Sequence, residues 1–196
     1  MQNAEVLAEV FPGFLQWWRD WQDSAKIILA WYLEANIDVL AEKKVILTQV
    51  ALELISWILF VEKEQTVSPK DFDKFRASNK LKKLLSKFKI PLEIPPNSPT
   101  EALGKLAADE KWQDGPHAFT DIRNGLVHPK NRKKIFDAPS EAKIEICDLG
   151  LWYLELLLIA IFDYKGRYSD RRYKCRWAGE TQLVPWVEPE QLHTYP

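Results

Sequence analysis

The sequence predicts an all-α protein, an antiparallel helical bundle that ends in a short β-hairpin. Two observations predict the bundle. Apolar residues recur at three- and four-residue spacing over several long segments, and the short polar joints between some of them make consecutive helices antiparallel neighbours. A third observation predicts the hairpin, because basic and apolar residues alternate near the C-terminus. We divide the chain into an aromatic N-terminal segment (residues 1–24), the bundle (25–164) and a basic tail (165–196).

Composition bounds the class of protein. The 196 residues, 46% of them hydrophobic, suffice for one domain with a substantial core. A net charge of −1 provides no global field that would attract nucleic acid, so an RNA site must be a local patch. Cys147 and Cys175 lack metal-ligand spacing and are interpreted as free thiols. The start of the chain lacks the basic region of a secretory signal, and the most apolar run, residues 149–162, is too short to span a bilayer. These features predict a soluble, cytoplasmic protein with no membrane span.

The first helices follow from their apolar stripes. After a predicted turn at residues 11–14, four aromatic residues share one helical face, which is typical of a short helix that seals the bundle. An exposed aromatic face for a partner is the alternative. Long helices are then predicted over residues 25–41 and 44–63. Glu53 lies on the solvent-facing side of the second helix or in a polar cleft, where its carboxylate would contact Arg123 and help to position it.

Prolines and polar caps mark the next elements. Residues 68–69 start a helix that carries a run of lysines between positions 80 and 89, interpreted as a solvated face or, alternatively, a track for phosphates. Residues 90–97 form an extended connector, and a capping box at 98–101 opens a short helix. The last long helix, residues 139–164, is apolar nearly all round, so it is the central helix or a dimer helix.

The tail is the most basic part of the chain. Residues 171–177 alternate basic and apolar side chains and return through residues 181–184, which predicts the hairpin. Its face carries Arg172, Lys174 and Arg176, and aromatic residues are interleaved with them. Such a mixture suits single-stranded RNA, whose bases stack and whose phosphates pair with cations. The alternative is an edge hairpin that its charges protect from aggregation.

A second segment concentrates residues that can do chemistry. Arg123 stands five positions ahead of His128, and Asn124 follows the arginine. Arginine is a permanent planar cation suited to phosphate, and histidine exchanges protons near neutral pH. Positions five apart on a helix are offset by about 140° and would splay unless the helix ends between them. Gly125 can end a helix over residues 116–125, which would let both side chains face one cleft.

The motif from Arg123 to Pro129, with long amphipathic helices on both sides, resembles the HEPN superfamily. That superfamily comprises small helical domains whose signature is arginine, a polar residue and, a few residues later, histidine. The resemblance implies a metal-independent, cofactor-free endoribonuclease that acts as a homodimer, in a toxin or phage-defence setting. It assigns proton transfer to His128, stabilisation of the phosphorane charge to Arg123, and orientation of the phosphate or the histidine to Asn124.

Further residues around the motif complete the candidate site. The basic segment after Pro129 would raise the local concentration of RNA; it contains Lys130, Arg132, Lys133 and Lys134. His117 precedes Arg123 by six positions and is a second candidate for the same cleft, although a histidine at a helix start is more often a cap. No metal-ligand cluster and no phosphate-cradling loop is found in the sequence.

Two other functions remain open. Some HEPN-like domains bind RNA or proteins without catalysis, and the Arg123–His128 pair would then be a surface arginine and a capping histidine. A subset of the superfamily pairs with an antitoxin that modifies a tyrosine three positions after the motif histidine. Asn131 occupies that position here, which disfavours this pairing but leaves an antitoxin or regulatory protein open as a partner. The third interpretation is a helical interaction protein whose tryptophan-rich faces bind another protein.

Overall fold

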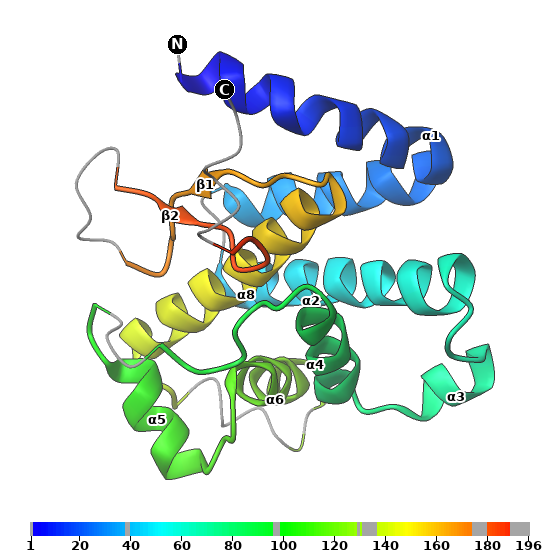
Figure 1. Ribbon diagram of the computed structural model, residues 1–196. Coiled ribbons are helices and arrows are strands. Elements are labelled where there is room, and N and C mark those ends of the chain that lie inside the picture. The colour runs from blue at the N-terminus through cyan, green and yellow to red at the C-terminus, as the bar shows by residue number, and fades with distance from the viewer. Residues whose placement is uncertain are drawn as a thin grey trace.

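The computed structural model describes residues 2–37, 40–95, 99–128, 130, 137–173 and 180–188, and this part of the chain is mostly helical (Figure 1). The helices are α1 (Gln2–Asn36), α2 (Ala41–Trp57) with its π-helical continuation η1 (Ile58–Lys63), α3 (Pro69–Lys74), α4 (Ala77–Lys87), α5 (Ala102–Glu110), α6 (Gly115–Val127) and α8 (Ser140–Ile161). The strands β1 (Arg167–Tyr168) and β2 (Gln182–Leu183) pair antiparallel. The prediction of a helical fold with a C-terminal hairpin is confirmed.

The helix α8 forms the centre of the core, where it contacts α1, α2, α5 and α6 (Figure 1). Its residues are buried on nearly every side, with Trp152 and Tyr153 among the largest fully buried side chains. A helix that is apolar all round is expected to be surrounded by other elements. Most of the apolar surface of α8 is therefore covered within one chain, as a central helix requires, while Ile144 near its start stays exposed.

The helix α1 corrects the prediction of a turn at residues 11–14. It runs from Gln2 to Asn36 and passes through the predicted boundary at residue 24, with non-helical backbone angles at Trp21. The reason lies in tertiary packing. A Cβ atom on Gly13 would stand 2.0 Å from the carbonyl oxygen of Phe162, so glycine permits α1 to cross the end of α8. Trp17 packs on Phe162 beside this contact, as the sealing interpretation predicts.

One helical stretch among the described residues, Ala41–Lys63, is long and apolar enough to cross a membrane. Within its most apolar window, however, 61% of the residues are buried inside the protein. The core helix of a folded domain can have the same length and hydropathy as a membrane span. The helix α2 fits this description, since it contacts α1, α4, α6 and α8.

The lysine run of α4 and of the turn after it connects this helix to its neighbours. Four of its lysines form ion pairs with carboxylates of other segments: Lys80 with Glu53 at 2.6 Å, Lys82 with Asp114 at 2.6 Å, Lys87 with Glu64 at 2.6 Å and Lys89 with Glu188 at 3.8 Å. Lys83 lies over the ring of Phe60. Most of these charges are neutralised, and the side chains of Lys80, Lys82 and Lys87 are largely covered. The run is therefore neither a solvated face nor a free track for phosphates, because it holds α4 to its neighbours.

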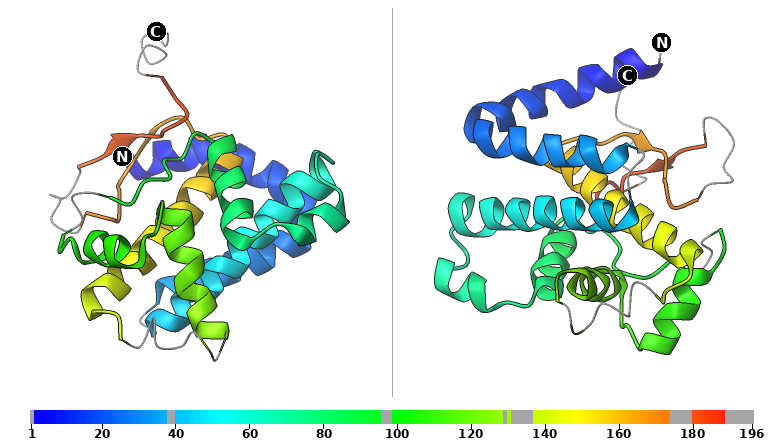
Figure 2. Two further views of the ribbon diagram at one scale, coloured as in Figure 1. Left: turned by 90° about the horizontal axis from the view of Figure 1, so that it is seen from below. Right: turned by 180° about the vertical axis from the view of Figure 1, so that it is seen from behind.

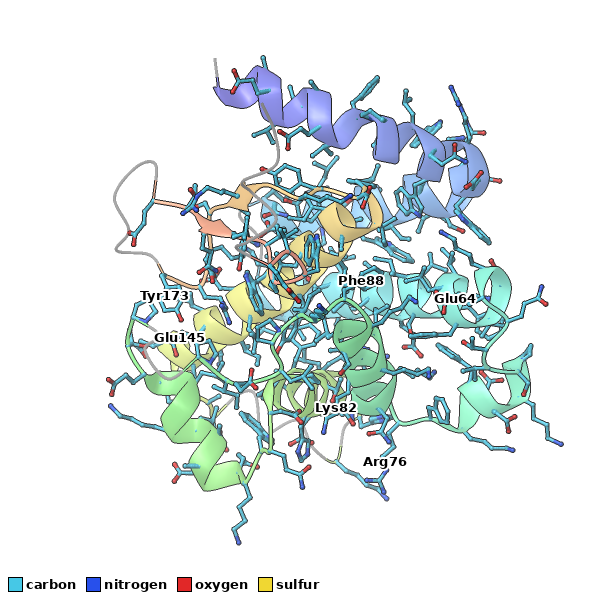
Figure 3. All side chains as sticks on the ribbon, in the orientation of Figure 1. Glu64, Arg76, Lys82, Phe88, Glu145 and Tyr173 are labelled. Atoms are coloured by element: carbon cyan, nitrogen blue, oxygen red, sulfur yellow. The ribbon has the colours of Figure 1, made fainter. Side chains whose placement is uncertain are left out.

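The helix α5 takes its N-terminal cap from another helix. Its first residues were predicted to cap themselves, but Glu101 adopts left-handed backbone angles and its side chain makes no capping bond. Instead the carboxylate of Glu145, on α8, accepts hydrogen bonds from the Leu103 amide at 2.8 Å and from the amide and hydroxyl of Thr100 (Figure 3). The side chain of Glu145 is thus held where the unpaired N–H groups of α5 begin.

The tail differs from the predicted hairpin in which residues form its first strand. Arg167 pairs with Leu183 and Tyr168 with Gln182, whereas residues 171–173 follow the strand as a turn. The buried carboxylate of Asp170 causes this turn, because it accepts from the backbone amide of Arg172 at 3.0 Å. The remainder of the predicted first strand, residues 174–177, lies outside the described residues.

A partly buried polar network ties the tail to α1 and α8. The Tyr32 hydroxyl donates to Glu155 at 3.0 Å, and Arg171 approaches the same carboxylate at 3.3 Å. Arg171 also donates to the Asn36 side chain at 2.7 Å. The pKa of Tyr32 is raised to about 12, mainly because the residue is partly buried. Burial also raises the pKa of the Glu155 carboxyl, against the opposing effect of Arg171.

Candidate active site

The helix α6 carries the motif and begins at a well-formed cap. The Asp114 side chain accepts the backbone N–H of His117 at 2.9 Å, and a proline occupies the first turn. The predicted end at Gly125 is wrong, since Gly125 is buried inside the helix and the helix continues to Val127. It ends at His128, whose backbone is extended (φ −112°, ψ 110°) because the next residue in the sequence is a proline.

A cleft of about 580 Å³ lies along α6, between this helix, the start of α4 and the middle of α2. Arg123 and Asn124 line it, as do Glu53 and His117. Four of the residues singled out from the sequence therefore border one cavity, although they come from helices far apart in the chain. Arg76, at the junction of α3 and α4, lines the cleft as well; Figure 3 labels its side chain.

His128 is not among the residues that line this cleft. Its backbone N–H donates to the carbonyl of Asn124 at 3.0 Å, so it stands one helical turn beyond that residue. His117, Asp121, Asn124 and His128 are spaced by four, three and four positions, which places them along one side of α6. The exposed imidazole of His128 thus stands beyond one end of the cleft, on the side of α6 that carries Asn124.

Two arginines, Arg123 and Arg76, line the cleft together with Lys80 and Asp121. The Asp121 carboxylate accepts the indole N–H of Trp112 at 2.9 Å. Arg123 donates to the side chain of its neighbour Asn124 at 3.3 Å. Within the described part of the chain, neither Arg123 nor Arg76 forms a salt bridge with a carboxylate. Sequence reasoning missed Arg76, because a single arginine before a helix has no local pattern that relates it to Arg123. Only the packing of α4 against α6 brings the two guanidinium groups to the same cavity.

Glu53 lines the cleft but does not bind Arg123, which corrects the predicted pairing. Its carboxylate binds Lys80 at 2.6 Å, and the Lys80 ammonium also lies over the ring of Phe72, 4.2 Å from its centroid. This ion pair neutralises the carboxylate that would otherwise compete with an incoming phosphate for Arg123.

His117 lies in the first turn of α6, where Asp114 is the capping residue. The His117 backbone N–H takes part in the helix cap, and its ring lines the cleft. The ring Nδ1 accepts the backbone N–H of Gln113 at 3.3 Å. In this arrangement Nδ1 carries no proton, so Nε2 is the ring nitrogen that can donate a hydrogen bond to a ligand.

The predicted RNA-binding cations fall into three groups. Lys130 is exposed two residues beyond His128. Arg132, Lys133, Lys134, Lys174 and Arg176 lie outside the described residues. Arg172 has a side chain that is only 11% exposed; its guanidinium binds Asp170 at 2.7 Å and stacks on the ring of Trp152, 3.3 Å from its centroid. The charge of Arg172 is occupied within the fold, so the RNA surface proposed below does not include it.

Comparison with known proteins gives one family. The model of the YopA C-terminal domain matches residues 18–184 of the chain. The chain is also 36% identical, over 190 residues, to the SPbeta prophage-derived uncharacterized protein YopA of Bacillus subtilis (strain 168). That match covers 94% of this chain and 41% of the relative, so the chain spans less than half of the relative's length. No solved structure matches the chain. Because none of these matches names the HEPN superfamily, that resemblance stays a prediction.

Proposed function

This chain belongs to the YopA C-terminal domain family, and we propose that it is a metal-independent endoribonuclease of the HEPN type. The observation that carries this proposal is the cleft in which Arg123 and Asn124 of the motif meet Arg76 and His117. Two arginines without carboxylate partners among the described residues form a site for a phosphodiester, because their planar forks match phosphate oxygens.

The chemistry of the proposed reaction requires only side chains and the substrate. RNA carries its own nucleophile, the 2′-hydroxyl, which attacks the adjacent phosphorus. His128 takes the hydroxyl proton or delivers a proton to the leaving 5′-oxygen. Arg123 neutralises the charge that develops on the phosphorane, and Asn124 orients the phosphate. The products are a 2′,3′-cyclic phosphate and a 5′-hydroxyl. The relative YopA is prophage-derived, which supports a toxin or phage-defence setting for the proposed activity. A cytoplasmic location is part of the same proposal.

A homodimer is part of the proposal, because one motif histidine cannot easily serve both faces of an in-line displacement. The ends of α6, α2 and α8 that flank His128 lie together at one end of the bundle (Figure 2, left). Exposed apolar side chains gather at these ends and at the end of α1: Ile37, Leu40, Val127 and Ile144. Leu40 alone is 76% exposed. Burying such a patch against a second copy would place two motifs next to each other.

The dimer predicts a definite response to a charge in that patch. We expect sedimentation velocity to show a dimer for the natural chain and a monomer after Val127→Glu, since a buried unpaired carboxylate opposes association. Ile27→Glu, at an exposed position in the second half of α1, is the matched control and should leave the dimer intact. A natural chain that stays monomeric at every accessible concentration, with its cleavage activity intact, would contradict the composite site.

RNA binding tests the cleft separately from catalysis. Reversing the charge of Arg76 with Arg76→Glu should weaken the binding of single-stranded RNA about tenfold and lower its salt dependence, because one phosphate contact is lost. Arg19→Glu, at an exposed position of α1, is the matched control and should change neither quantity. Binding that is unchanged by Arg76→Glu would exclude this cleft as the RNA site. Binding without cleavage by the natural chain would favour the non-catalytic RNA-binding alternative.

A further inference from the structure

A second cavity, separate from the proposed RNA cleft, lies where α1, η1, α4 and α8 meet. It has a volume of about 280 Å³. Its walls are apolar and aromatic, with Trp17 and Trp21 from α1, Ile58 from η1 and Phe88 from the end of α4. Figure 3 labels Phe88, which follows the end of α4, and the rim residue Glu64, which follows the end of η1. Apolar walls with a few polar groups at the opening are the usual composition of a small-molecule site.

Three irregularities of the backbone surround this cavity. Trp21 has non-helical angles inside α1. The wider π-helical turn of η1 replaces an α-helical end of α2. Asp163, at the end of α8, has a positive φ of 58°. All three elements contribute residues to the lining. Each departure costs conformational free energy, and such departures concentrate at ligand sites, where they shape a cavity that regular helices would fill.

The charges at the rim indicate which ligand the cavity would accept. Glu64 is bound to Lys87 at 2.6 Å, and Asp163 is bound to Lys165 at 3.3 Å. Lys63, the other charged residue of the lining, forms no salt bridge within the described residues. The rim therefore offers one ammonium group that is not matched by a carboxylate.

We propose that this cavity binds a small amphiphilic carboxylate, with the apolar body of the ligand between Trp17, Trp21 and Phe88 and its carboxylate on Lys63. The volume lies just below the range that drug-sized ligands occupy, so the ligand is a short aliphatic or aromatic acid. The inference is independent of the proposed RNA cleavage, since Arg123 and His128 do not line this cavity.

Calorimetric titration with octanoate, below its micelle concentration, tests the proposal. Octanoate should bind at one site and change the tryptophan emission, while 1-octanol and octylamine, which lack the anionic group, should bind at least tenfold more weakly. Lys63→Gln should weaken octanoate binding about tenfold, because a charge-assisted hydrogen bond is lost. Lys70→Gln, at an exposed lysine of α3, is the matched control and should leave the affinity unchanged.

A second variant tests the cavity itself. Ala160→Leu adds a side chain to the lining and should abolish octanoate binding, while circular dichroism shows whether the helices and the melting transition persist. Equal affinity for octanoate and 1-octanol, or an unchanged affinity in Lys63→Gln, would overturn the assignment of an anionic ligand. Absence of heat and of any tryptophan response in the folded natural chain would overturn the site altogether.

Discussion

Replacing Arg123 with alanine is expected to reduce RNA cleavage about a hundred- to a thousandfold, the typical cost of losing an electrostatic donor at a developing charge. His128→Ala should cost about a hundred- to ten-thousandfold, as the loss of a general acid or base does. The melting temperature should change by only about 1–2 °C in either variant, because His128 is exposed and the Arg123 side chain lines an open cleft. Cleavage rates on a defined RNA and thermal unfolding curves measure both quantities.

Two controls separate chemistry from structure in this experiment. Arg123→Lys keeps the charge but loses the planar fork, so it should fail nearly as badly as alanine. Arg19→Ala removes an exposed arginine outside the cleft and should cleave at the natural rate. Full cleavage by His128→Ala would place the activity elsewhere or in a contaminant. A large drop in melting temperature would show that the histidine acts mainly as the cap of α6.

The largest effect on stability is expected from Glu145→Ala. Glu145 is only 8% exposed, and its carboxylate accepts hydrogen bonds from the Thr100 amide, the Thr100 hydroxyl and the Leu103 amide at the start of α5. Alanine would leave the amides of Thr100 and Leu103 without their acceptor, which costs about 3 kcal/mol or more of unfolding free energy. For a chain of this size that corresponds to a melting temperature lower by roughly 6–12 °C, measurable by circular dichroism.

Two further variants on α8 show whether the loss of stability comes from the hydrogen bonds of Glu145. Glu145→Gln should lose less stability than Glu145→Ala, because the amide oxygen still accepts while the amide nitrogen cannot. Glu141→Ala removes an exposed carboxylate one turn earlier on α8 and should change the free energy of unfolding by less than about 0.5 kcal/mol. Equal stability of Glu141→Ala and Glu145→Ala would show that the capping contacts contribute nothing.

Local patterns in the sequence predicted most of the helices. The apolar periodicity of α2 and α8 is strong enough to identify both, and the proline after residue 68 marks the start of α3. Within the site, a short motif in α6 sufficed to single out Arg123 and Asn124, and the structure places both on one cleft. These features depend on neighbours in sequence, which is why sequence reasoning reaches them.

The features that sequence reasoning missed depend on contacts between distant segments. Pro12-Gly13 has the composition of a turn, but the close approach to Phe162 keeps it helical. The cap on α5 comes from Glu145, more than thirty residues later. Arg76 reaches the cleft only because α4 packs against α6. In the first case tertiary packing overrides the local turn propensity. In the other two it creates contacts that no local pattern in the sequence encodes.

Incubation of the purified chain with RNA in excess EDTA, followed by analysis of the product ends, tests the proposed function most directly. The account predicts cleavage that chelation does not reduce, 2′,3′-cyclic phosphate and 5′-hydroxyl ends, and loss of these products in both Arg123→Ala and His128→Ala. RNA that stays intact under these conditions, or products that carry 5′-phosphate ends, would contradict it.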